Sequence, residues 1–349
     1  MEELLFLSKR MTRRRYARCC RVDRAAVVFH GDCDGVIAAG LYIRHFLMDL
    51  YPDSVSLKFT QPWRAYSDVR SAAEPNASQV VILDVAMDPQ LFEEVKRLVW
   101  RGARVVFIDH HASSRRFLKE LEATGAKVLW DLAQSTPQVL LKALSRVNSY
   151  EEFLIKVANV CEGADPLREA GDRARAEEIA LGADRVKLSL ALDPLDVNFV
   201  KRLVDAVVRG EEVWRLQEVV ERHRRAKWLL GVMLRAIERR MESVGSWVLA
   251  SFTSAESVLY AGLFGIAASE LSKRLRRSIV IVRDEGRKVV ITVRSSEKKA
   301  LDVCKALADA MGSNSFGGHR EAASITVVGR SLNEVVEKVR EVLSAIGDG

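Results

Sequence analysis

The stretch VVFHGDCDGV, Val27–Val36, indicates the fold class of the amino-terminal half. Its β-branched and aromatic residues are typical of a buried strand, and Gly35 followed by IAAGLYIRHF is typical of a turn into a helix. His30, Asp32 and Asp34 follow the apolar run at alternate positions. We therefore predict a strand with three potential metal ligands at its carboxyl end, where open α/β sheets usually hold ligands.

This pattern recurs later in the sequence. The apolar run VVILDV ends near Asp84, and RVVFIDHH ends in Asp109, His110 and His111. Three of the six histidines therefore lie at predicted strand ends. The recurrence disfavours the alternative that these residues are ordinary polar side chains of solvated loops.

A cluster of carboxylates and imidazoles at neighbouring strand ends favours a metal site. Without a cation, such a cluster would be destabilised by repulsion and by loss of hydration. Oxygen and nitrogen ligands without thiolates favour Mn²⁺ or Mg²⁺, with Co²⁺ as a further candidate, over structural zinc. Cys33 lies between two of the aspartates, but strand alternation predicts that it points away and is inert.

Two cations that share a carboxylate activate water for in-line attack at phosphorus. Asp84 is the expected bridge, because it stands alone at the end of its strand. The alternative is that Asp84 caps the next helix. Asp88 suits that role better, since it precedes Pro89 and Asp with Pro marks helix starts.

These motifs resemble those of the DHH phosphoesterases, in particular the RecJ-like branch. His30–Gly35 matches the H-x-D-x-D-G motif, Asp84 lies in the expected ILD, and Asp109-His110-His111 is the signature triplet. A fourth family motif supplies another aspartate. Its best match is Asp165, and its competitors are Asp131 and Asp172.

The resemblance also implies roles for these residues. It assigns the ligands of two divalent cations, the first held by His30, Asp32 and Asp84, and the second by Asp34, Asp84, His110 and Asp165. It further implies that Asp109 orients its neighbours and that His111 faces the scissile phosphate. A carboxylate of this kind fixes the tautomer of a ligating imidazole.

The carboxyl-terminal part resembles the substrate-binding domain associated with DHH enzymes. The matching segments are VRSS, residues 293–296, and SFGGHREAAS, residues 315–324. Glycines allow a phosphate to approach the backbone, and the planar fork of an arginine suits phosphate oxygens. The implied substrate-binding residues are Arg294, Ser295, Gly317, Gly318, His319 and Arg320.

The sequence departs from this pattern at two positions, where glycine is usual. Phe316 and Ser324 replace those glycines. For Phe316, the favoured interpretation is an apolar anchor for the loop, and the alternative is a surface for stacking a base. The same alternative exists for Trp63, for which burial is the favoured interpretation.

Hydrophobic periodicity predicts an α/β protein with an amino-terminal, mainly parallel sheet flanked by helices. Its strands are expected near 25–30, 55–59, 79–84, 104–109 and 127–130. We predict a DHH metal-binding domain over 1–193, a helical connector over 194–245 and a smaller α/β DHH-associated domain over 246–349. In the last of these, helices are expected near 264–277, 298–311 and 331–346. A cleft between the two domains is the expected substrate site.

The sequence of 349 residues carries a formal net charge of +7, which favours polyanionic partners. A basic cluster near the amino terminus could steer nucleic acid, lie on a solvated helix or dock a partner. It comprises Lys9, Arg10, Arg13, Arg14, Arg15, Arg18, Arg21 and Arg24.

The five cysteines have no C-x-x-C spacing, and they indicate no disulfide framework. We therefore expect a reducing, cytoplasmic location. No apolar run approaches the roughly 18 residues of a membrane span, and the initial LLFLS is too short for a signal peptide.

Three functions are consistent with these features. The first is a metal-dependent exonuclease of single-stranded DNA or RNA. The second is a phosphoesterase of small nucleotides, such as short oligoribonucleotides, cyclic dinucleotides or nucleotide monophosphate esters, which compactness favours. The third is a non-catalytic scaffold for replication or repair, disfavoured because every expected ligand type is present. Expected partners are single-stranded nucleic acid or short oligonucleotides, together with a replication or repair protein.

Overall fold

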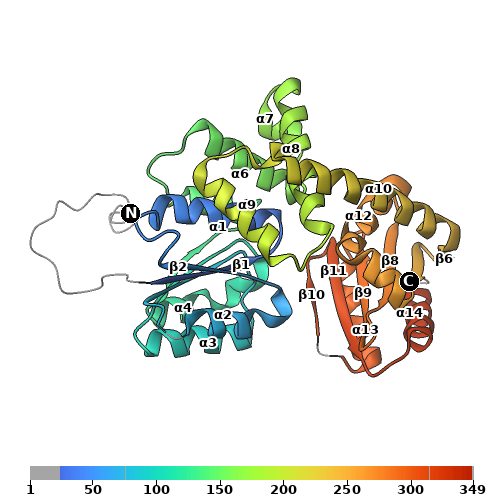
Figure 1. Ribbon diagram of the computed structural model, residues 1–349. Coiled ribbons are helices and arrows are strands. Elements are labelled where there is room, and N and C mark those ends of the chain that lie inside the picture. Colours follow the sequence, from blue (N-terminus) through green and yellow to red (C-terminus); the bar gives the residue numbers. More distant parts are fainter. Residues whose placement is uncertain (1–23, 75, 314, 348–349) are drawn as a thin grey trace, which may run out of the picture. The chain divides into compact units, whose positions relative to one another are not determined.

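The computed structural model describes residues 24–74, 76–313 and 315–347. The chain divides into two compact units. Unit 1 comprises Met1–Leu190 and Leu195–Val220, and unit 2 comprises Ala191–Pro194 and Glu221–Gly349. Both units are α/β, as the periodicity predicts (Figure 1).

Unit 1 is built on a five-stranded sheet in which every pairing is parallel. The order is β2-β1-β3-β4-β5. The predicted strands are confirmed to within one residue: β1 (Ala25–His30), β2 (Val55–Thr60), β3 (Gln79–Leu83), β4 (Arg104–Asp109) and β5 (Lys127–Trp130). Because consecutive parallel strands need crossover connections, a helix follows each of the first four strands.

Helices cover both faces of this sheet (Figure 1). Strand alternation divides its apolar residues, so Val27 and Phe29 join one core while Val28 joins the other. The first core is covered by α1 (Cys33–Phe46), α5 (Thr136–Leu141), α6 (Ser149–Cys161), α8 (Arg173–Ala191) and α9 (Val197–Arg209). The second is covered by α2 (Ala65–Ala73), α3 (Pro89–Trp100) and α4 (Leu118–Ala123).

Short elements complete unit 1. They are η2 (Pro62–Arg64), η3 (Ala112–Phe117), α7 (Pro166–Ala170) and η4 (Val213–Arg215). Asp88 caps α3 by accepting hydrogen bonds from the backbone N–H groups of Gln90 and Leu91, both at 2.8 Å. The predicted cap is thereby confirmed, and Asp84 is left for another role.

Unit 2 contains a six-stranded mixed sheet in the order β10-β11-β9-β8-β7-β6. Its β7 and β8 are parallel, and its other neighbours are antiparallel. The strands are β6 (Glu242–Val244), β7 (Trp247–Phe252), β8 (Ser278–Asp284), β9 (Lys288–Arg294), β10 (Phe316–Gly318) and β11 (Ala322–Val328). Strand β10 falls within a segment expected to be a loop, because its two glycines mask any strand pattern.

The helices of unit 2 lie close to the predicted positions. α13 (Ala300–Met311) and α14 (Leu332–Gly347) share a core with Val280 and Val282 of β8. α12 (Phe264–Leu275) packs against β8 and β9. It is preceded by α11 (Ser254–Leu259) and η5 (Ala261–Leu263).

The segment predicted as a connector, 194–245, is largely helical. It holds α9, η4, α10 (Gln217–Arg240) and β6. α9 packs on α1 within unit 1, and the division between the units falls in α10 after Val220.

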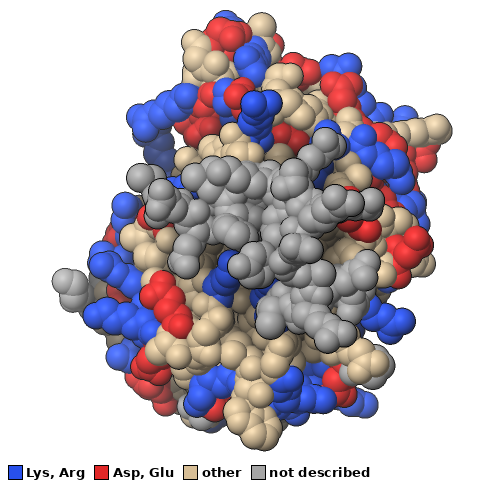
Figure 2. Space-filling model, turned by 90° about the vertical axis from the view of Figure 1, so that its left-hand side faces the viewer, with Lys and Arg blue, Asp and Glu red and all other residues tan. Residues whose placement is uncertain are grey.

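Charges of both signs occupy the visible described surface of the face shown in Figure 2, where Lys and Arg are interspersed with Asp and Glu. From the predicted basic cluster, Lys9 to Arg21 lie outside the described residues. Arg24 is described, and its carbonyl accepts hydrogen bonds from the backbone N–H groups of Ser78 and Gln79. Among the described residues, no helix has the length and apolarity needed to cross a membrane.

The structure corrects the expectation for Cys33. This residue is not part of the strand but opens α1, so strand alternation does not set its direction. Its sulfur forms a disulfide with Cys161, the last residue of α6. No local pattern predicts this bond, because the two cysteines are 128 residues apart.

Candidate metal centre

The predicted ligands meet at the carboxyl edge of the unit 1 sheet. His30 ends β1, Asp84 follows β3, and Asp109 ends β4 immediately before His110. These three strands are direct neighbours in the order β1-β3-β4. Parallel pairing therefore places their ends side by side, as the sequence pattern predicts.

The turn after β1 positions two carboxylates. Asp32 caps α1, and its Oδ1 accepts a hydrogen bond of 3.0 Å from the Gly35 N–H. A Cβ at Gly35 would lie 2.1 Å from the His30 carbonyl oxygen, so only glycine fits. Asp34 is 1% exposed in the first turn of α1, and its two oxygens lie 3.2 and 3.1 Å from the Thr136 N–H at the start of α5.

Asp84 occupies the middle of the cluster. Its backbone φ of 57° is left-handed, a conformation that Asp tolerates better than most residues. Oδ1 accepts a hydrogen bond of 3.0 Å from the Thr136 hydroxyl. Oδ2 is buried without a hydrogen-bond partner, and it lies 3.6 Å from His30 Nδ1. A buried carboxylate oxygen in this state is strongly disfavoured unless a cation binds it.

The backbone fixes one imidazole in an orientation suited to metal binding. His110 Nδ1 lies 3.3 Å from the Ala133 carbonyl oxygen. A neutral imidazole that donates there leaves Nε2 unprotonated, and Nε2 lies 3.5 Å from both Asp34 Oδ2 and Asp84 Oδ1. His30 Nδ1 lies 3.0 Å from Asp32 Oδ2.

Two groups of potential ligands share Asp84. One is His30, Asp32 and Asp84, and the other is Asp84, His110 and His111. Within each group the ligand atoms lie within 4.8 Å of one another. This arrangement fits a pair of divalent cations bridged by Asp84, and its oxygen and nitrogen donors suit Mn²⁺ or Mg²⁺.

The pKa shifts in the site reflect an excess of negative charge among its buried carboxylates. Burial would raise the pKa of Asp84, but the imidazoles of His110 and His30 hold it well below its usual range. Burial and the Asp84 carboxylate raise the pKa of Asp34 well above its usual range. Burial would lower the pKa of His30, but Asp32 and Asp84 raise it well above 6.5. Protons on these groups offset the negative charge that cations would otherwise neutralise.

Asp109 is completely buried and orients the signature triplet. Its Oδ1 lies 2.6 Å from His111 Nδ1, and its Oδ2 accepts a hydrogen bond of 2.5 Å from the Ser114 hydroxyl. Burial would lower the pKa of His111, but the Asp109 carboxylate raises it to about 9. The His111 carbonyl accepts a further hydrogen bond of 2.9 Å from Trp130 Nε1. These contacts fix the His111 ring and keep a proton on it.

The three aspartates proposed for the fourth motif lie elsewhere. Asp165 caps α7 through the Leu167 N–H, 3.0 Å away, and is exposed. Asp131 is ion-paired with Lys142, and Asp172 accepts a hydrogen bond from the Arg175 N–H. Among the described residues, none of the three belongs to either ligand group.

Sequence reasoning missed Glu162 and Thr136. Loss of hydration at the Glu162 carboxyl and the charges of Asp32 and Asp84 raise its pKa to about 7, although Glu162 as a whole is exposed. Thr136 binds Asp34 and Asp84, as described above. Neither follows a strand pattern. The triplet Ser-Thr-Pro at the start of α5 was the only sequence signal for Thr136.

In unit 2, the predicted substrate-binding residues gather at one end of β9 and β11. Arg294 pairs with Ala322 across the two strands, and the Ala322 carbonyl accepts a hydrogen bond of 2.7 Å from the His319 N–H. Arg294 Nε donates to the Ser269 hydroxyl at 2.9 Å. Arg294 Nη1 donates a further hydrogen bond of 3.0 Å to the Val293 carbonyl.

The glycines predicted to approach phosphate belong to the β10–β11 hairpin. Gly317 and Gly318 pair with Ser324 and Ala323 and are exposed. Gly318 has a φ of 134°, and a Cβ there would lie 2.4 Å from the Ala322 carbonyl oxygen. Ser295 accepts hydrogen bonds from the backbone N–H groups of Glu297 and Lys299, which supports the turn after β9.

Two aromatic residues lie at the surface, contrary to the favoured interpretation of burial. Trp63 is 67% exposed, and Phe316 is 40% exposed. Trp63 belongs to a single helical turn, and Phe316 belongs to an edge strand. Neither local structure directs the ring into a core.

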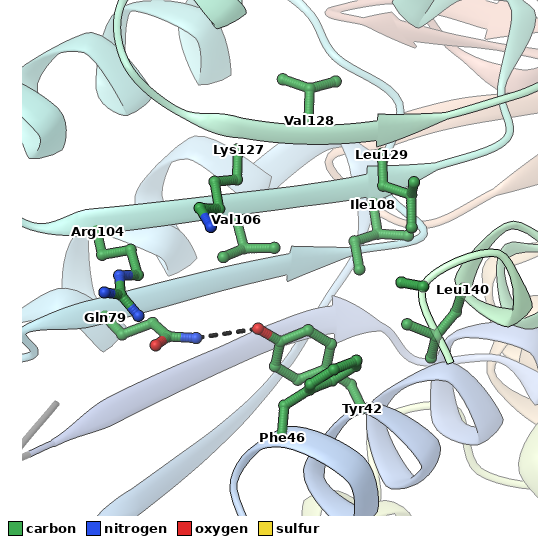
Figure 3. Close-up of a pocket in the computed structure, with 11 residues that line it drawn as sticks. Tyr42, Phe46, Gln79, Arg104, Val106, Ile108, Lys127, Val128, Leu129 and Leu140 are labelled. Carbon is green, nitrogen blue, oxygen red and sulfur yellow. Dashed lines mark hydrogen bonds between the residues drawn. The ribbon is translucent and has the colours of Figure 1, made fainter. Parts of the chain in front are cut away.

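A separate cavity lies on the α1 side of the unit 1 sheet (Figure 3). Apolar side chains of β4 and β5 line it, together with Tyr42 and Phe46 of α1. Gln79 Nε2 donates a hydrogen bond of 3.0 Å to the Tyr42 hydroxyl at its base. The cavity includes none of the predicted ligands, so the metal centre is distinct from it.

Comparison with known proteins agrees with these features. Residues 249–345 match the DHHA1 domain. A search of curated proteins finds no significant match.

Solved structures share the fold across both units. RecJ of Thermus thermophilus in complex with Mn²⁺ has a TM-score of 0.65 at 19% identity over 93% of this chain, which spans 52% of that chain. A DHH domain described as coming from a member of a ribosomal-protein family has a TM-score of 0.68 at 16% identity. The match covers 92% of this chain and 86% of that domain. The pGpG-specific phosphodiesterase of Vibrio cholerae has a TM-score of 0.58 at 14% identity, with 92% and 99% covered.

The sequence motifs, the DHHA1 match and the shared fold agree with one another. Residues 249–345 therefore form a DHHA1 domain, and the chain shares its fold with RecJ and other DHH proteins of known structure.

Proposed function

We propose that this protein is a divalent-metal-dependent phosphodiesterase that removes nucleotides from one end of single-stranded DNA or RNA. The observation that carries the proposal is the Asp84 carboxylate. Its buried Oδ2 has no hydrogen-bond partner and lies 3.6 Å from His30 Nδ1, and its Oδ1 lies 3.5 Å from His110 Nε2. Two ligand groups that share one carboxylate, Asp84, are the arrangement that two-cation phosphoester hydrolysis requires.

In this mechanism His30, Asp32, Asp34, Asp84 and His110 hold the cations. When bound, the cations supply the positive charge that activates water and stabilises the charge developing at phosphorus. Thr136 orients Asp34 and Asp84 through its N–H and its hydroxyl. Asp165 is not part of this ligand set.

His111 acts on the substrate. His111 lies in the second ligand group, but we assign it to the substrate because Asp109 holds its Nδ1 and raises the pKa of the ring. We assign Nε2 as the donor to a nonbridging oxygen of the scissile phosphate, where a hydrogen bond from a charged imidazole strengthens as negative charge develops. In unit 2, Arg294 and the backbone at Gly317 and Gly318 have the chemistry to bind a phosphate of a nucleotide substrate.

A second candidate is a phosphoesterase of small nucleotides. It is supported by the extent of the shared fold with the pGpG-specific phosphodiesterase, of which the chain covers 99%. The two candidates differ in the substrate length that they accept.

End-labelled single strands of increasing length, incubated with Mn²⁺, Mg²⁺ or Co²⁺, test both candidates. Stepwise shortening of long strands supports the exonuclease. Activity confined to strands of about two to five nucleotides, with intact longer strands, supports the second candidate. Absence of hydrolysis with all three cations would overturn both and favour a non-catalytic scaffold.

A further inference from the structure

The carboxyl edge of unit 1 carries an exposed aromatic ring that the metal centre does not use. Trp63 lies in η2, three residues beyond the end of β2, and 67% of its surface is exposed. β2 is the neighbour of β1, and His30 pairs with Thr60 in register. Trp63 therefore stands on the same sheet edge as the metal ligands, at most about 10 Å of chain from Thr60.

Direct contacts connect this ring to the ligand-bearing turn. The Phe59 ring packs against the backbone at Gly31, where a Cβ would lie 2.6 Å from Phe59 Cδ2. The Arg64 guanidinium lies 5.8 Å from the Phe59 ring and 5.7 Å from the Trp63 ring. Gly31 separates His30 from Asp32, so a continuous set of contacts runs from the metal ligands to Trp63.

A buried carboxylate holds the arginine in this position. Arg64 Nε lies 2.8 Å from Asp68 Oδ2, and the same oxygen accepts a hydrogen bond of 2.6 Å from the Thr60 hydroxyl. Asp68 is 7% exposed. The cation beneath Trp63 is thus fixed before any ligand binds, which lowers the entropic cost of using the ring as a platform.

We propose that Trp63 stacks on the nucleobase of a nucleotide adjacent to the scissile phosphate. This inference rests on the proposed function and narrows its substrate class to nucleotides with a base beside the cleaved bond, as opposed to inorganic polyphosphate. A stacked base is sequence-tolerant, because every base offers a π face. The site would therefore bind single strands without strong sequence preference.

The test measures binding separately from cleavage. A fluorescently labelled thymidine oligonucleotide with phosphorothioate linkages is titrated with protein in Mn²⁺. We expect Trp63→Ala to weaken its binding about tenfold, as stacking of one base typically contributes, and Trp63→Phe to keep most of the affinity. The matched control is Trp100→Ala, since Trp100 is 88% exposed at the far end of α3. That variant should bind like the wild type.

A second arm uses the wild-type protein and does not depend on a folded variant. A series of oligonucleotides is compared, each lacking the base at one position. We expect the wild type to bind more weakly when the missing base is at one particular position near the end of the strand. At that position Trp63→Ala should show no additional loss. Competition by inorganic tripolyphosphate should be equal for wild type and Trp63→Ala, because this probe has no base.

Equal oligonucleotide affinities for wild type and Trp63→Ala, or no abasic position that matters, would overturn the stacking proposal. Hydrolysis of unmodified strands in Mn²⁺ is measured in parallel. If Trp63→Ala weakens binding while no strand is cleaved by the wild type, the proposed function fails and the stacking site stands. If the wild type cleaves strands and Trp63→Ala binds the oligonucleotide like the wild type, the stacking proposal fails and the proposed function stands.

Discussion

The two units differ in the sign and the burial of their clustered charges. At the carboxyl edge of unit 1, Asp34, Asp84 and Asp109 are at most 3% exposed. At the β9–β11 end of unit 2, Arg294 is half-buried, and His319 and Arg320 are exposed. Buried carboxylates require cations, whereas a cationic, glycine-bearing surface suits anions. The contrast supports the proposal that unit 1 carries the catalytic residues and that unit 2 binds substrate.

The largest effect is expected from Asp84→Asn. Asparagine tolerates the left-handed backbone of this position, so the fold should be kept, while the bridge between the two ligand groups is lost. Hydrolysis should fall about a thousandfold or more, since two-cation catalysis contributes several kcal/mol. The measurements are the hydrolysis rate and Mn²⁺ binding by calorimetry.

Arg294→Gln is the matched control in unit 2. It should leave Mn²⁺ affinity unchanged and raise KM, because Arg294 lies outside both ligand groups. If Asp84→Asn bound Mn²⁺ like the wild type, or if Arg294→Gln lost Mn²⁺ binding, the division of roles between the units would be wrong.

The disulfide is expected to stabilise unit 1 alone. Cys33 and Cys161 close a loop with a separation of 128 residues, for which the chain-entropy treatment predicts about 4–5 kcal/mol. Cys161→Ala should therefore lower the melting temperature of unit 1 and leave the unfolding of unit 2 unchanged. Calorimetry with and without a reductant measures this difference.

Reduction of the wild type should reproduce the effect of Cys161→Ala and have no effect on that variant. A melting profile insensitive to both changes would show that the bond does not form in solution. Disulfides are rare in the reducing cytosol of mesophiles and common in intracellular proteins of hyperthermophiles.

Thr136→Val removes a hydroxyl from the metal centre while preserving side-chain shape. We expect Mn²⁺ affinity to fall about tenfold, the lower end of the loss typical for residues that orient metal ligands. Asp84 Oδ1 would lose its 3.0 Å hydrogen bond, whereas the N–H contacts to Asp34 would persist. Thr136→Ser, which retains the hydroxyl, should bind Mn²⁺ like the wild type. If Thr136→Val bound Mn²⁺ with the affinity of the wild type, the Thr136 hydroxyl would have no role in orienting the metal ligands.

The last prediction concerns the buried thiol of unit 2. Burial raises the pKa of Cys304 to about 12, while an unfolded cysteine titrates near about 8.5. Above about pH 8.5 the Cys304 thiol is deprotonated in the unfolded state but stays protonated in the folded state. The free energy of unfolding therefore falls by about 1.4 kcal/mol per pH unit. The free energy of unfolding of unit 2 should thus fall from about pH 8.5 upward.

Cys304→Ala lacks this titration. The difference in stability between the wild type and this variant should narrow by about 2 kcal/mol between about pH 8 and pH 10. Denaturant unfolding at the two pH values gives the difference directly. A constant difference would mean that the thiol titrates normally in the folded unit. In unit 1, no such titration is expected from Cys33 or Cys161 while they are bonded.

Much of the architecture follows from local sequence patterns. Apolar runs followed by His30, Asp84 and Asp109 predict the parallel strands and the edge at which they end, because strand direction in βαβ units is set locally. Gly35 predicts the turn that only glycine fits. The order of the motifs also predicts the family.

How distant segments complete the site depends instead on the packing of the whole unit. Thr136 reaches Asp34 and Asp84 across 102 and 52 residues, and the partner of Cys33 lies 128 residues away. Asp165, the best but looser match to the fourth motif, caps a short helix, and Trp63 is exposed rather than buried. Periodicity reports which face of an element is apolar, but the contacts between elements depend on how the helices pack on the sheet.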